Sequence, residues 1–89
     1  MIRLTRLVLD ILKPHEPNVL EFSTLLAEQG NLRVAVTVLE MDDKTETLEV
    51  VVEGPDIDFE RIRNEIASFG ASLHSIDEVE VESGPESSA

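Results

Sequence analysis

The stretch Leu7-Val-Leu-Asp-Ile-Leu-Lys-Pro-His-Glu-Pro17 decides the fold. Five of its first six residues are apolar, and they lack helical spacing. A run of this kind predicts a strand that is covered on both faces, in the middle of a sheet. Asp10 is the exception inside the strand. Lys13 ends the run, and Pro14 removes a donor that ladder pairing needs.

A helix is expected directly after this strand. Pro17 suits the first helical position, where a missing N–H costs little. Glu16 then places a carboxylate at the positive end of the helix.

The remaining pattern divides into elements of ordinary length. Asp58 is a suitable N-cap for a second helix, and Gly30 and Gly70 follow the two helical stripes. Val79 and Ile76 are out of phase in the last strand, so a bulge is expected near residues 75–77. The predicted strands are residues 2–13, 32–41, 46–53 and 72–81, and the predicted helices are residues 17–29 and 59–69.

The order βαββαβ is that of a ferredoxin-like sandwich, an α+β fold. We expect a four-stranded antiparallel sheet of order 4-1-3-2 with both helices on one face, because both crossovers are right-handed. Residues 1–82 form a single domain in this prediction. Residues 83–89 are polar and are expected to be a disordered acidic, serine-containing tail.

The net charge is -12, from 19 acidic and 7 basic residues, which argues against a nucleic-acid partner. No apolar run approaches the roughly 20 residues of a membrane span, so no membrane partner is expected. There is no cysteine, which removes disulfides and thiolate metal sites. The N-terminus lacks a signal-peptide pattern, and the expected location is the cytoplasm.

The topology brings several chemically active side chains to one end of the sheet. Both histidines of the chain fall there, together with the carboxylates of the 42–46 hairpin. Imidazole suits zinc and other transition metals, and carboxylates suit calcium or magnesium. No tight ligand spacing is present. The candidate ligand or metal residues are Asp10, His15, Glu16, His74 and Asp77, with Asp42, Asp43 and Glu46 as secondary candidates.

Structural roles for the same residues stay open. His15 would cap the helix junction, and His74 would face solvent or a neighbouring subunit. Asp10 would pair with Arg6 on the same face or bind across a subunit interface. The face of the sheet without helices mixes apolar and polar residues, which is typical of a partner surface. We therefore expect a homo-oligomer.

Catalysis has little support in the sequence. The serines sit in no nucleophile motif, and the glycine patterns that bind phosphates or dinucleotides are absent. His74 and Ser75 are neighbours in a strand, so their side chains point to opposite faces and cannot form a relay. We expect no enzyme activity, with a hydrolase-type activity as the alternative.

Four strings resemble the domain of unknown function 211 family, which consists of small, mostly archaeal proteins. They are residues 6–17, 45–54, 56–59 and 74–79, and the likeness extends over roughly residues 2–81. The resemblance implies a ferredoxin-like fold and ring-like or other homo-oligomers. It also implies bound divalent cations, with calcium in at least one member. It implies no activity, and the acidity and the Ser/Glu tail of this chain depart from the family pattern.

The functional hypothesis is an oligomeric binding module without catalysis. It would bind a divalent cation, such as calcium, or a small metabolite at a subunit interface. The alternatives are a regulatory module that acts on a partner protein and a purely structural assembly unit.

The acidic, lysine-poor composition fits a halophilic protein, with simple solubility as the alternative interpretation. If the acids are an adaptation to salt, the melting temperature rises between low and about 1 M salt, because screening over roughly 3 Å weakens self-repulsion. Thermal denaturation followed by circular dichroism measures this. A melting temperature that does not change with salt contradicts the halophilic interpretation.

Overall fold

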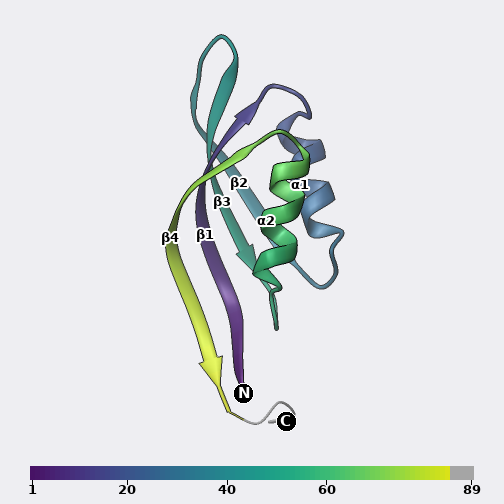
Figure 1. Ribbon diagram of the computed structural model, residues 1–89, viewed down its shortest axis with the longest axis vertical. Coiled ribbons are helices and arrows are strands. Elements are labelled where there is room, and N and C mark those ends of the chain that lie inside the picture. The colour runs from purple at the N-terminus through teal and green to yellow at the C-terminus, as the bar shows by residue number, and fades with distance from the viewer. Residues whose placement is uncertain (85–89) are drawn as a thin grey trace.

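The structure, a computed structural model, describes residues 1–84. Its elements follow the predicted order βαββαβ (Figure 1). The strands are β1 (Ile2–Pro14), β2 (Arg33–Met41), β3 (Thr45–Glu53) and β4 (Ser72–Ser83), and the helices are α1 (Val19–Ala27) and α2 (Phe59–Ser68).

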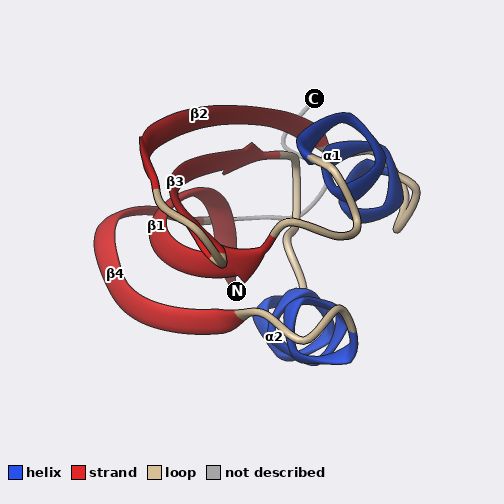
Figure 2. Ribbon diagram, turned by 90° about the horizontal axis from the view of Figure 1, so that it is seen from above, coloured by secondary structure: helices blue, strands red, loops and turns tan. Residues whose placement is uncertain are grey.

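One antiparallel sheet of order β2-β3-β1-β4 forms a single layer. This is the predicted order 4-1-3-2 read from the other edge. Both helices cover the same face of the sheet, which is strongly curled (Figure 2). The fold is therefore the predicted α+β ferredoxin-like sandwich.

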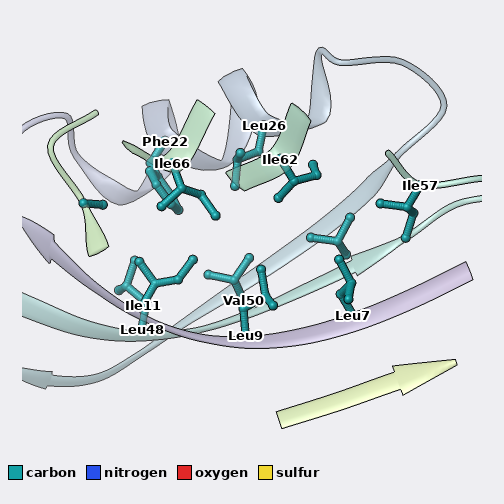
Figure 3. Packing of buried hydrophobic residues seen from close by; sticks show 12 residues of the cluster. Leu7, Leu9, Ile11, Phe22, Leu26, Leu48, Val50, Ile57, Ile62 and Ile66 are labelled. Carbon is teal, nitrogen blue, oxygen red and sulfur yellow. The ribbon is translucent and has the colours of Figure 1, made fainter. Parts of the chain in front are cut away.

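The core lies between the sheet and the helices (Figure 3). Alternate residues of β1 and β3 point into it, as the period of a strand requires. They meet Phe22 and Leu26 of α1 and Ile62 and Ile66 of α2, all at most 1% exposed. Phe22 also packs edge-on against Phe69, with ring centroids 5.6 Å apart. The buried residues that the strands contribute are Leu7, Leu9, Ile11, Leu48, Val50 and Val52.

Each helix begins at a side-chain cap. The Asp58 carboxylate accepts a hydrogen bond from the Arg61 amide at 3.2 Å, which confirms the predicted N-cap of α2. The prediction for α1 is wrong by two residues. Its N-cap is Asn18, whose side chain accepts from Glu21 N at 2.8 Å, so Pro17 precedes the helix. The side-chain oxygen of Asn18 gives the free backbone N–H of Glu21 a hydrogen-bond acceptor. Proline in the first turn would only remove one such N–H and would satisfy none.

The last strand is longer than predicted and less regular. β4 continues through Ser83, which the sequence assigned to the tail, because Ser83 pairs with Ile2. Its register with β1 shifts between Glu78 and Ile76 and again between Ser75 and Leu73. The first shift confirms the predicted bulge. The rest of the predicted tail, residues 85–89, lies outside the described residues.

Candidate functional site

The end of β1 carries a buried charge. Lys13 follows Leu7, Leu9 and Ile11 on the face toward the helices, and its side chain is fully buried. Its register partner on β3 is Glu46, which is 6% exposed and shares the inward phase of that strand. Burying an unpaired charge is costly, so the two side chains must satisfy one another and their surroundings.

Main-chain oxygens of the β1–α1 loop surround the Lys13 ammonium. Nζ donates to Pro14 O at 2.7 Å and to Pro17 O, and it lies 3.4 Å from His15 O. It also lies 3.0 Å from Glu46 Oε1, a contact that is close enough for an ion pair but lacks the angles of a hydrogen bond. Lys13 therefore holds the loop in a curve around its own side chain.

His15 extends this arrangement to the β2–β3 hairpin. Its Nδ1 lies 3.1 Å from Glu46 Oε2, and its Nε2 lies 3.0 Å from Asp42 O and 3.2 Å from Asp43 O. All three partners are acceptors, so only the imidazolium, with both nitrogens protonated, donates on both sides. The hydrogen bond to Glu46, assisted by the two carbonyls, outweighs desolvation and raises the pKa of His15.

The two carboxyl groups beside His15 are already engaged. Burial raises the pKa of Glu46, but the bonds from His15 and Lys13 outweigh it, so the pKa lies below its ordinary value. Asp42 Oδ1 accepts from Thr45 N at 2.9 Å, from Lys44 N at 3.0 Å and from Thr45 Oγ1 at 3.1 Å. The Thr45 amide is the main reason that the pKa of Asp42 is lowered. The Asp42 carboxylate thus closes the hairpin turn.

A second group of candidate residues lies on the helix-free face of the sheet. Asp10 and Leu12 of β1, Thr47 of β3 and His74 of β4 line an open hollow of about 280 Å³. We call it the open-face hollow. Asp10 is half-buried between Glu49 and Ser75, its register neighbours. Within the described part of the chain, its carboxylate forms no side-chain hydrogen bond or ion pair.

The bulges of β4 determine where His74 and Asp77 lie. Both residues fall at register shifts, so neither has a partner directly across on β1. An extra residue of this kind re-aims the neighbouring side chains. His74 lines the hollow beside Asp10, whereas Asp77 accepts a hydrogen bond from Ser75 Oγ at 2.7 Å.

The sequence-predicted site residues therefore form two groups. His15, Glu46 and the Asp42–Asp43 backbone make one, and Asp10 with His74 makes the other. Glu16 is exposed in the loop that precedes α1. In residues 1–84 no three histidine or carboxylate side chains are placed to hold a metal ion.

The predicted pairing of Asp10 with Arg6 is wrong. Arg6 contacts Glu53 at 2.6 Å, Glu78 at 3.2 Å and Glu80 at 3.9 Å. Glu53 of β3 and Glu80 of β4 lie directly across from it, and Glu78 lies two residues further along β4. These carboxylates raise the pKa of Arg6, with the hydrogen bond to Glu53 as the largest cause.

Sequence reasoning missed the role of Lys13. The signal was present, because position 13 continues the inward phase of positions 7, 9 and 11, and position 46 continues that of 48, 50 and 52. Two oppositely charged residues that both face inward on paired strands, such as Lys13 and Glu46, predict a buried ion pair.

Comparison with known proteins agrees with the resemblance of the quoted strings. A model of the domain of unknown function 211 family, described as uncharacterised ArCR, matches residues 5–84. The chain belongs to this family. An uncharacterised protein of Methanocaldococcus jannaschii is 47% identical to this family member over 75 residues, which cover 83% of this chain and 77% of the relative. Neither helix of this family member is long and apolar enough to cross a membrane, within the residues described.

Replacing Lys13 tests the buried cluster. Lys13→Met leaves the Glu46 carboxylate buried without its ammonium, and we expect a loss of about 3–5 kcal/mol in the free energy of unfolding. The melting temperature falls by roughly 4–8 °C for each kcal/mol in a domain of this size. Urea denaturation and thermal melting measure both quantities.

The controls for this prediction use the same chain. Lys44→Met removes the other lysine, which is exposed, and changes stability by less than about 0.5 kcal/mol. The double variant Lys13→Met with Glu46→Leu regains most of the loss, because no unpaired charge stays buried. A Lys13→Met protein as stable as the wild type contradicts the role of the cluster.

The contact of His15 with acceptors makes stability depend on pH. A histidine whose pKa is raised by folding stabilises the protein fully below its unfolded value of about 6.5, and the effect is lost as pH rises through the folded pKa. The size is modest, because the side chain is 38% exposed and water screens it. We expect the free energy of unfolding to fall as the pH rises from about 6.5 through the raised pKa of His15.

The two histidines separate this effect from other titrations. His15→Gln removes most of this fall, whereas His74→Gln keeps it. Urea denaturation over the pH range gives the free energies, and NMR titration of the ring protons gives the pKa of His15 directly. If both variants keep the fall in the free energy of unfolding, protonation of His15 is not coupled to folding.

Proposed function

We propose that the protein is a non-catalytic, oligomeric binding module of the cytoplasm that holds a small ligand in the open-face hollow. The observation that carries this proposal is the half-buried Asp10 carboxylate in the middle of a central strand, beside His74 and without a side-chain partner in the described chain. Partial burial of a carboxylate without a partner costs free energy of folding, and a ligand or a partner chain would offset that cost.

The surroundings of the hollow support a subunit interface. Leu12 at its rim is 43% exposed, and Leu39 on the neighbouring part of the sheet is 56% exposed. Apolar side chains of this size on an open sheet face are typical of a surface that another molecule covers. A ligand in the hollow would then lie between two subunits.

The lining defines two ligand classes. Asp10, His74 and Thr47 supply a carboxylate, an imidazole and a hydroxyl, which suit a divalent cation or a small polar metabolite with a cationic group. One chain supplies too few ligands for a complete metal coordination sphere. A cation in the hollow therefore needs further groups from a second subunit or from water.

Native mass spectrometry of the chelator-stripped protein tests this proposal, with calcium, magnesium and zinc added one at a time. We expect one of these ions to bind in a fixed number per subunit. Asp10→Asn and His74→Gln should each weaken that binding at least tenfold, because each removes a donor from the hollow. Isothermal titration measures the dissociation constants.

A matched control removes a carboxylate elsewhere. Asp56→Asn lies in the β3–α2 connection, is exposed, and should leave ion binding unchanged. Equal losses in all three variants would mean that the ions respond to net charge only. Diffuse ion adducts on an unchanged assembly would contradict the cation form of the proposal.

A further inference from the structure

The sheet extends beyond the helices at one end. Residues 2–6 at the start of β1 pair there with residues 80–83 at the end of β4, and α2 stops short of this end (Figure 1). The bonds from Ile57 N to Leu4 O at 2.8 Å and from Gly54 N to Thr5 O at 3.2 Å mark the limit of the body. We call residues 1–6 and 78–84 the arm.

The arm has one apolar face and one ionic face. Leu4 pairs with Val81 and Leu7 pairs with Val79, so both valines share the face of the buried core leucine. Ile2 follows in the same phase. Ile2, Leu4, Val79 and Val81 form what we call the apolar strip. Three of the four are exposed, at 67% for Ile2, 53% for Val79 and 58% for Val81.

The charges of the arm lie on its other face. Arg3 contacts Glu82 at 3.3 Å, and Arg6 contacts Glu78 and Glu80. The glutamates alternate with the valines along β4, so the period of the strand separates them from the apolar strip. In a chain of net charge -12, the strip is thus a charge-free surface.

An uncovered ribbon of this kind needs a partner. Two strands alone are at best marginally stable in water, and the strip exposes apolar side chains where no helix lies over it.

We propose that the apolar strip packs against the apolar strip of a second copy of this chain, face to face about a two-fold axis. A charge-free strip is complementary to itself under such an axis. Two acidic chains approach there with the least repulsion, because the glutamates of both arms point away from the contact and are paired with arginines. This inference rests on the proposed self-association and adds a second contact surface, on the face of the sheet opposite the open-face hollow.

The alternative of pairing two β4 edges is disfavoured by charge. An antiparallel β4–β4 ladder would place two rows of carboxylates, from Glu78, Glu80 and Glu82 of each chain, about 5 Å apart across the strands. Like charges directly opposite each other are destabilising. The face-to-face arrangement keeps these rows on the outer surfaces.

Single cysteines test the geometry, since the chain has none of its own. Val81→Cys places a thiol on the apolar strip, and Glu80→Cys places one on the ionic face of the same strand. Leu20→Cys is also exposed, at 77% against 58% for Val81, but lies on α1, outside both the apolar strip and the open-face hollow. With a short bis-maleimide cross-linker in about 1 M salt, we expect covalent dimers of Val81→Cys at least tenfold faster than of the other two.

Two further measurements complete the test. Sedimentation of the unmodified chain in about 1 M salt should show a mass above the 9.9 kDa of one copy. The double variant Val79→Thr with Val81→Thr should raise the dissociation constant at least tenfold, because it buries two hydroxyls in the contact, whereas Leu20→Thr on α1 should not. Circular dichroism of both variants checks that the sheet is intact.

The outcomes separate this inference from the proposed function. A monomeric wild type overturns both the arm contact and the proposed oligomer. An oligomer in which Glu80→Cys cross-links as fast as Val81→Cys, or in which the threonine variant associates normally, overturns the arm contact alone. Loss of ion binding in Asp10→Asn, with cross-linking of Val81→Cys unchanged, leaves the arm contact standing.

Discussion

The ion pair between Lys13 and Glu46 is the constraint on which the rest of the structure depends. Both charges are buried, on the inward face of adjacent central strands. A shift of β1 against β3 by one residue would turn the core residues outward and leave a charge without its partner. Pro14 and Pro17 supply carbonyls to the same ammonium, which directs the chain from β1 to the start of α1. Replacing such a pair by apolar residues is often tolerated, but breaking it is not. The pair therefore specifies register and the loop path together.

The same cluster of Lys13, Glu46 and His15 also decides which of the candidate site residues are free to meet a ligand. His15 uses both ring nitrogens on Glu46 and on the hairpin carbonyls, which leaves His74 and Asp10 as the side chains available on the helix-free face. A histidine with two acceptor contacts links the end of β1 to the β2–β3 turn. Its protonation then affects how firmly the hairpin is held, while the open-face hollow lies across the sheet from the core.

Local sequence patterns predicted most of the fold. The apolar run in residues 7–12, the alternation in residues 46–53, the Asp58 cap and the glycines after the helical stripes all report on neighbours within a few residues. The errors have physical reasons. Pro17 suits a first helical turn, but Asn18 offers an acceptor for Glu21 N and wins. Asp10 and Arg6 share a face, but glutamates on both adjacent strands lie nearer to Arg6.

By itself the sequence determined the α+β class, the order of elements, the acidic surface and the family, because periodicity, capping and local motifs are short-range properties. Only the tertiary structure decided that the two histidines belong to different groups, that Lys13 is the most constrained charge, and that one end of the sheet projects as an arm. Each of these follows from cross-strand register, and the bulges at His74 and Asp77 change that register. Register depends on residues that are far apart in the sequence, such as Arg3 and Glu82, which are 79 positions apart, and no local pattern contains it.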